Sequence, residues 1–304
     1  MTHIAKKDDG KEIRKVTLIG MAVNLVLTGL KFIFGFFGHS SALVADAIHS
    51  ASDLITDIAI LIGSKFWNSP PDADHPNGHR RFETLISIGI GFAIIGVAVF
   101  LAIDSISNLY KQKFSHPDFF TAIVALAALV FKELLFRYTQ KAARKIRSQA
   151  LEANAWHHRS DAFSSLPVFI AILLSLCLPE YGFIDSLGAL LVSGFIGKSG
   201  YDIIKPGIHQ VVDGAPDIKT SEKLKAIAAN FPGVISVHNF RVRYIGNDLQ
   251  VDLHIVVNAS ISLIEAHDLS ENVEKALINS GENVVDAMVH IDPFNEEKLN
   301  NENV

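Results

Sequence analysis

Long apolar segments separated by short polar connections dominate the first two thirds of the chain. The first, residues 16–38, contains one charge, Lys31, and is long enough to cross a hydrocarbon core of about 30 Å as a helix. Five comparable segments follow at about residues 41–64, 82–108, 117–137, 150–178 and 183–204. The pattern predicts a polytopic α-helical membrane protein with six transmembrane helices in residues 1–208. A soluble helical bundle is the alternative, but so many apolar runs are hard to bury without lipid.

The hydrophobic period changes after residue 208. Residues 220–231 and 262–280 read as amphipathic helices, while residues 235–246, 249–258 and 282–292 alternate apolar and polar positions as strands do. The order αββαβ predicts a small α+β domain over residues 209–293, ferredoxin-like or metallochaperone-like, with its helices on one face of the sheet. Residues 294–304 are predicted to form a polar tail.

Charge separates the same two regions. The 304 residues carry a net charge of −5, but residues 1–208 hold 20 basic and 17 acidic side chains (+3), whereas residues 209–304 hold 7 and 15 (−8). An acidic chain is a poor partner for nucleic acid, whose binding depends on Lys and Arg. The single cysteine, Cys177, excludes an intrachain disulfide and any multi-cysteine zinc site, so a bound metal needs His and carboxylate ligands.

Basic residues in the connections predict the orientation of the helices. They gather before the first segment, after the second and after the fourth, whereas the opposite connections contain few. We therefore expect both termini to face the cytoplasm. The residues concerned are Lys6, Lys7, Lys11, Arg14, Lys15, Lys65, Arg80, Arg81, Arg137, Lys141, Arg144, Lys145 and Arg147.

Two of the predicted membrane helices contain ionisable side chains at helical spacing. The second has Asp46, His49, Asp53 and Asp57 on one stripe, and the fifth has Asn154, His157, Asp161 and Ser165 on one face. Such groups are costly in lipid, so the stripe must face a polar cavity or a counter-charge. Both helices carry His-x-x-x-Asp, and together His49, Asp53, His157 and Asp161 offer the four ligands that Zn²⁺ prefers. The alternative is a buried polar cluster that only fixes helix packing.

Two further groups of His and Asp lie outside the membrane segments. Asp72, His75 and His79 in the connection after the second segment could bind a metal or form a solvated loop, and spacing alone does not separate these readings. In the C-terminal region, the histidines together with Asp252 and Asp292 suggest a cytoplasmic metal site. These histidines are His238, His254, His267 and His290.

The sequence resembles the cation diffusion facilitator family of metal-ion/proton antiporters over nearly its whole length. The specific motifs are ALVADAIHSASD, DADHPNGHRRFE, NAWHHRSDAFSS and VHIDP. The resemblance implies a transport site at His49, Asp53, His157 and Asp161, and a surface site at Asp72, His75 and His79. It also implies a two-metal regulatory site in a cytoplasmic domain that dimerises, at His238, His254, His267, His290 and Asp292. A Lys–Asp bridge at the dimer interface of some members would correspond to Arg81 and Asp213.

Together with the residue patterns, this resemblance implies a homodimeric zinc/proton antiporter that works by alternating access in a bacterial inner membrane. Its partners would be lipid, protons and divalent ions, with Zn²⁺ as substrate and regulatory ligand and no prosthetic group. An exporter of Fe²⁺, Mn²⁺, Co²⁺ or Cd²⁺, a passive metal channel and a membrane-tethered metal sensor are the alternatives. No nucleophile–base motif or phosphate-binding glycine loop stands out, so we do not expect an enzyme.

Overall fold

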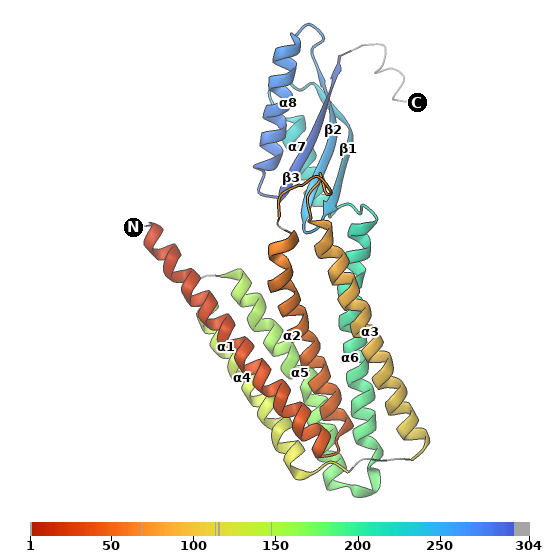
Figure 1. The fold of residues 1–304 in the computed structure, drawn as a ribbon. Coiled ribbons are helices and arrows are strands. Elements are labelled where there is room, and N and C mark those ends of the chain that lie inside the picture. The colour runs from red at the N-terminus through yellow and green to blue at the C-terminus, as the bar shows by residue number, and fades with distance from the viewer. Residues whose placement is uncertain (1, 68, 113, 115, 147, 295–304) are drawn as a thin grey trace. The chain divides into compact units, whose positions relative to one another are not determined.

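The computed structural model describes residues 2–67, 69–112, 114, 116–146 and 148–294 (Figure 1). Most of the predicted polar tail, residues 295–304, lies outside this description. Outside it too are Arg147 and the side chains of Lys6, Lys7, Lys11 and Lys65.

Six long helices occupy the region where six membrane segments are predicted. They are α1 (Thr2–Phe37), α2 (Ser41–Trp67), α3 (Arg81–Tyr110), α4 (Phe119–Ile146), α5 (Gln149–Cys177) and α6 (Phe183–Val211). Five have the length and apolarity of membrane spans over their described residues. The exception is α2, which carries Asp46, Asp53 and Asp57. The arrangement confirms a multi-pass helical membrane domain.

Two helices run further than the apolar pattern predicts. The basic stretch after residue 137 continues α4 through Ile146, so most of this stretch is not the loop that the sequence suggested. Its Lys and Arg residues are good helix formers. Similarly, α6 continues to Val211, three residues past the expected end of the membrane domain. Polarity marks where a span leaves lipid, but it does not end a helix.

The chain divides into two compact units, residues 1–62 with 89–203 and residues 63–88 with 204–304. The core of the first unit is rich in small and branched side chains, including Ala42, Ala125, Val168 and Ile196. Small residues let membrane helices approach closely. Large side chains such as Phe37 remain exposed on the helices, as expected for surfaces that face lipid.

The C-terminal elements follow the predicted order αββαβ. They are α7 (Ile218–Ala229), β1 (Ser236–Ile245), β2 (Asp248–Val257), α8 (Leu263–Ile278) and β3 (Val284–Pro293). The sheet has the order β1-β2-β3, with β2 antiparallel to β1 and parallel to β3. Figure 1 shows α7 and α8 beside this sheet.

Alternation along β2 assigns the two faces of the sheet. Leu249, Val251, Leu253 and Ile255 are buried in the core with residues of α7 and α8, such as Leu224. The residues between them therefore point to the opposite face, away from the helices. This arrangement confirms the predicted α+β fold, and it places His254 on the face that the helices leave open.

Candidate metal centres

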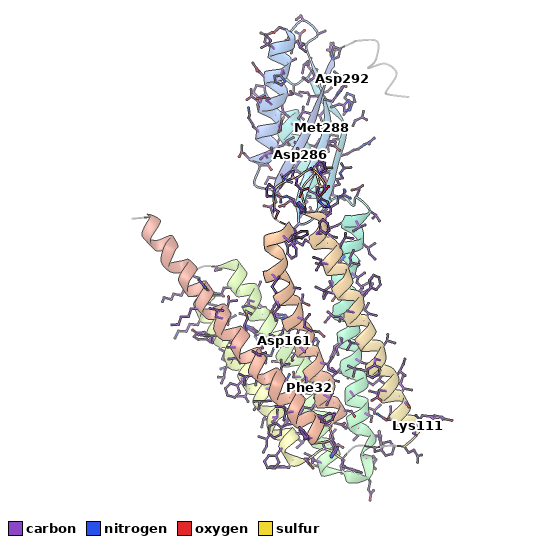
Figure 2. All side chains as sticks on the ribbon, in the orientation of Figure 1. Phe32, Lys111, Asp161, Asp286, Met288 and Asp292 are labelled. Atoms are coloured by element: carbon purple, nitrogen blue, oxygen red, sulfur yellow. The ribbon has the colours of Figure 1, made fainter. Side chains whose placement is uncertain are left out.

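The first cluster lies within the helical unit, on α2 and α5. One ligand atom from each of Asp53, His157 and Asp161 lies within 4.8 Å of the others. Asp161 is only 8% exposed, whereas the side chain of His157 is half exposed. Figure 2 shows Asp161 among the bundle helices. The structure thus brings together three of the four predicted transport-site residues.

His49 is the fourth predicted residue, and it is not a member of this three-residue group. It lies one helical turn before Asp53 and is buried. Its Nδ1 has no hydrogen-bond partner among the residues that the structure describes. On α5, both ring nitrogens of His158 are likewise buried without a partner in the described part of the chain. The bundle therefore holds imidazole nitrogens with spare binding capacity close in sequence to the cluster.

A lysine that the sequence patterns did not single out lies against this cluster. Lys132 on α4 is 2% exposed, and its Nζ lies 2.6 Å from Oδ2 of Asp161. The other carboxylate oxygen, Oδ1, lies 3.7 Å from Nδ1 of His157. Lys132 and Glu133 interrupt the otherwise largely apolar residues 119–136, and this Lys was the available signal, because a charge at that position needs a partner in lipid.

A second buried ion pair accounts for Asp46. Nζ of Lys31 on α1 lies 2.7 Å from Oδ2 of Asp46, and both side chains are almost fully buried. Lys31 also donates hydrogen bonds to Ser50 and Ser165, and Ser165 donates to Asp46. The predicted counter-charge for the polar stripe is therefore present. This network of hydrogen bonds and the ion pair joins α1, α2 and α5. It engages Asp46, which is not a member of the metal-ligand cluster.

The second cluster lies in the connection between α2 and α3. Oδ1 of Asp72 lies 3.5 Å from Nδ1 of His75, and Oδ2 lies 3.3 Å from Nε2 of His79. The three residues form a compact ligand group. Backbone hydrogen bonding from His75, aided by the nearby His79, holds the pKa of Asp72 below its usual range. The loop thus presents an ionised carboxylate between two imidazoles at physiological pH.

The third cluster is a row of histidines across the C-terminal sheet. His238, His254 and His290 are direct neighbours in the strand register. Oδ2 of Asp292 lies 3.0 Å from Nε2 of His238 and 3.0 Å from Nδ1 of His254. Nε2 of His290 lies 3.7 Å from Oδ1 of Asp292. Figure 2 shows Asp292 on this domain.

Two opposing effects act on the Asp292 carboxyl group. Partial burial favours its neutral form, but the hydrogen bond with His254 and the neighbouring imidazoles outweigh this and lower its pKa. Ionised carboxylate and neutral imidazole are both metal ligands. The donor atoms of His238, His254 and Asp292 therefore form a compact group that fits a divalent transition metal, and His290 lies next to this group but is not a member of it.

Other predicted residues have different surroundings. His267 lies on α8 with Nε2 3.4 Å from Oε1 of Glu271, and it is not a member of the group that includes Asp292. Asp252 lies 3.8 Å from Arg243. The pairing implied for a dimer interface occurs within one chain, where Arg81 Nη2 lies 2.9 Å from Asp213 Oδ1.

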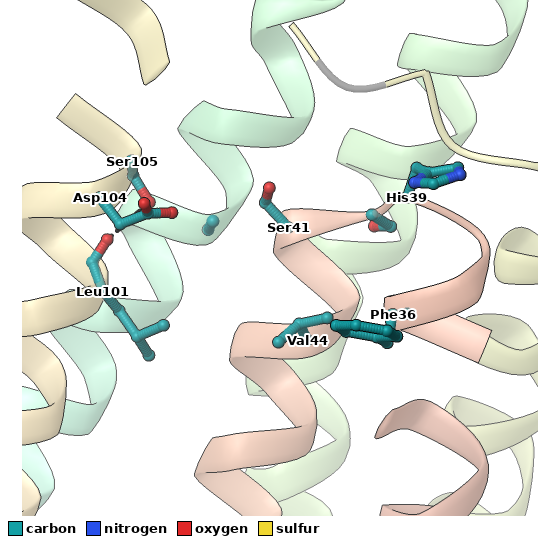
Figure 3. A pocket seen from close by; sticks show the side chains of 10 residues that line it. Phe36, His39, Ser41, Val44, Leu101, Asp104 and Ser105 are labelled. Carbon is teal, nitrogen blue, oxygen red and sulfur yellow. Dashed lines mark hydrogen bonds between the residues drawn. The ribbon is translucent and has the colours of Figure 1, made fainter. Parts of the chain in front are cut away.

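A cavity of about 270 Å³ lies near the connection between α1 and α2. In Figure 3, Asp104 lies beside Leu101 and Ser105 of α3, while His39 lies at the α1–α2 connection. Neither Asp104 nor His39 belongs to a metal-ligand group of the described residues. The described residues that line this cavity therefore include no member of the three metal-ligand clusters.

Nearly the whole chain is similar to transporters. A family model described as the cation efflux transmembrane domain matches residues 17–210, and one described as the cation efflux protein cytoplasmic domain matches residues 216–294. An uncharacterized transporter of Methanocaldococcus jannaschii is 36% identical over 93% of this chain and 99% of its own. The manganese efflux system protein MneS of Bacillus subtilis is 32% identical, covering 95% of this chain and 98% of its own.

The other matches include a plant protein and a solved structure. Metal tolerance protein 2 of Oryza sativa subsp. japonica is 32% identical over 95% of this chain and 82% of its own. A solved MamM CTD is 23% identical, covers 25% of this chain and 94% of its own, and has a TM-score of 0.25. The family models cover most of the residues, both in the helical region and in the C-terminal sheet. The chain belongs to the cation diffusion facilitator family, whose members transport divalent metal ions out of the cytoplasm.

Proposed function

We propose that this protein exports Zn²⁺ in exchange for protons and works by alternating access. The observation that carries the proposal is the cluster of Asp53, His157 and Asp161 inside a membrane bundle. Carboxylates and imidazoles placed in lipid are costly unless they serve a permeating ion or a counter-charge. His49, which is buried one helical turn before Asp53 and has an unpartnered Nδ1 among the described residues, is proposed as the fourth ligand. Four nitrogen and oxygen ligands suit Zn²⁺.

Proton coupling follows from the chemistry of the proposed ligands. An imidazole nitrogen binds a metal only when it carries no proton, so a metal ion and a proton compete for it. His157 is half exposed, whereas Asp161 is buried beside it. In the proposed cycle, metal binding on one side releases protons from the imidazoles, and protonation on the other side releases the metal.

The remaining features support a regulated homodimer. We propose a two-metal regulatory site in a dimerising domain of residues 209–293, with His238, His254, His290 and Asp292 on the sheet and His267 as a separate ligand on α8. The loop cluster of Asp72, His75 and His79 is proposed as a surface site within a transport domain of residues 1–208. We further propose that the protein lies in a bacterial inner membrane. Both termini would be cytoplasmic, because Arg14, Lys15 and the basic end of α4 would then face the same side.

Manganese is the second candidate cargo. Two relatives in Bacillus subtilis, MneS and MneP, are named manganese efflux system proteins and are 32% and 30% identical to this chain. The three-residue cluster also holds two carboxylates and one imidazole, and Mn²⁺ favours oxygen ligands. If His49 does not join the site, Mn²⁺ becomes the better match.

A metal-competition assay on the purified protein in sealed vesicles tests these proposals. Zinc uptake that saturates, resists excess Mn²⁺ and drives an opposing proton flux is expected for the zinc/proton antiporter. Preference for Mn²⁺ would replace the cargo, and metal movement without proton flux would exclude antiport. Flux that does not saturate would indicate a passive channel, and no flux with intact metal binding would indicate a tethered sensor.

A further inference from the structure

The buried lysine of α4 gives the two oxygens of Asp161 different surroundings. Lys132 Nζ lies 2.6 Å from Oδ2, so this oxygen accepts a charge-assisted hydrogen bond. Oδ1 lies 3.7 Å from Nδ1 of His157, which is another member of the ligand group. The carboxylate is thus held by one oxygen and offered by the other.

The lysine also changes the charge of the cluster. Asp53 and Asp161 carry two negative charges when ionised. The ammonium group of Lys132 offsets one of them, so these three side chains together carry a net charge of about −1. A divalent ion that approached Oδ2 would lie close to the ammonium group, and like charges repel strongly in a site shielded from water. An ion at Oδ1 lies further from the ammonium group.

We propose that Lys132 is a positioning residue of the transport site that makes Asp161 a one-oxygen ligand and so selects ions of low coordination number. The proposal rests on the proposed metal site. Groups that hydrogen-bond to ligands commonly orient them, and removing such groups changes metal affinity about 10- to 100-fold. Without Lys132, Asp161 can bind through both oxygens. That arrangement favours ions of higher coordination number, such as Mn²⁺, over Zn²⁺ and Co²⁺.

The second buried lysine provides a matched control. Lys31 is equally buried and pairs with Asp46 at 2.7 Å in the same unit, but neither residue belongs to the Asp53 cluster. Lys31→Met therefore removes a buried ammonium group without touching the proposed ligands. Loss of folding alone should affect both lysine variants, whereas a change in metal coordination should follow only Lys132.

The test uses Co²⁺ bound to the full chain, with the loop and sheet clusters disabled by Asp72→Ala and Asp292→Ala. Four-coordinate Co²⁺ absorbs visible light more strongly than Co²⁺ with more ligands. We expect a strong spectrum in this background, nearly the same spectrum in Lys132→Gln and Lys31→Met, and a weaker one in Lys132→Met. The ratio of Co²⁺ to Mn²⁺ affinity should fall about tenfold in Lys132→Met. Gln can still donate a hydrogen bond to Oδ2 but carries no charge. Lys132→Gln therefore separates the orienting effect of the hydrogen bond from the effect of the positive charge.

Different failures have different meanings. An unchanged spectrum and affinity ratio in folded Lys132→Met would overturn the role of Lys132 but leave the metal site standing. The Asp161→Asn change is also made in the background protein. If it does not reduce Co²⁺ binding, the proposed metal site itself is wrong. If Lys132→Met does not fold, Lys132→Ala, which leaves room for water at Oδ2, is measured in its place and judged by the same two readouts.

Discussion

The bundle cluster and the sheet cluster use the same residue types in different proportions. In the bundle, two carboxylates meet one imidazole, and a buried lysine holds one of the carboxylates. On the sheet, three imidazoles surround Asp292, whose ion pairs within the described residues are all with histidine. The sheet face is partly open to water, which can solvate an uncompensated charge. The bundle site lies where solvation of charge is costly, and there Lys132 offsets the charge of one of the two carboxylates.

The largest expected effect tests the bundle side of this comparison. Asp161→Asn should reduce metal transport to the level of empty vesicles, because it removes a buried ligand carboxylate. It should also cost about 3–5 kcal/mol of stability, since Lys132 would keep a buried charge without its partner. Transport is measured as metal uptake into vesicles, and stability by unfolding in detergent.

A double variant separates the two consequences of this change. Asp161→Asn with Lys132→Met should recover stability but not transport, because both charges are removed together. Asp104→Asn, which changes a cavity carboxylate outside the ligand group, serves as the control and should transport normally. Uptake close to the native rate by Asp161→Asn would refute the assignment of the transport site.

The next effect concerns the ion pair that is buried but lies outside the metal cluster. Lys31→Met should lower the free energy of unfolding by about 3 kcal/mol, because Asp46 would lose its buried partner. Unfolding in detergent measures this loss, and Lys198→Met serves as the control because its pair with Asp202 is exposed. A native-like stability for Lys31→Met would show that water or another group compensates Asp46.

Metal binding at the sheet cluster should have a smaller effect. With free Zn²⁺ about 100-fold above its dissociation constant, the domain should gain about 2.7 kcal/mol. Hydrogen exchange at β2 and β3 measures this gain locally. Asp292→Asn should abolish it, whereas Asp286→Asn, on the same strand and paired with Gln250, should not. Equal protection in both variants would argue that the histidine row does not bind the metal.

The smallest effect is the pH dependence of the metal-free sheet cluster. The pKa of Asp292 is lowered in the folded protein. Its ionised form therefore stabilises the fold fully at pH values above the pKa of an unperturbed Asp, about 4. That contribution is lost as the pH falls through the lowered value. The stability difference between native protein and Asp292→Asn should therefore shrink on acidification. A difference that grows below pH 4 would contradict the assigned direction.

Local patterns predicted much of the fold and part of the site. Runs near the thickness of a bilayer indicated the membrane helices, and alternation indicated the three strands, because both depend on neighbours in sequence. The i, i+4 spacing placed His157 and Asp161 on one face of α5. The same reasoning grouped Asp46 with Asp53, since it describes a single helix and takes no account of which neighbour each face meets.

The sequence by itself therefore determined the segments, their faces and the kinds of ligand available. Only the tertiary structure decided which charges meet: Lys31 with Asp46, Lys132 with Asp161, and three histidines across neighbouring strands. The physical reason is that these partners lie on different elements. Helical and strand periodicity describe each element alone, whereas ion pairing and strand register depend on how the elements pack together.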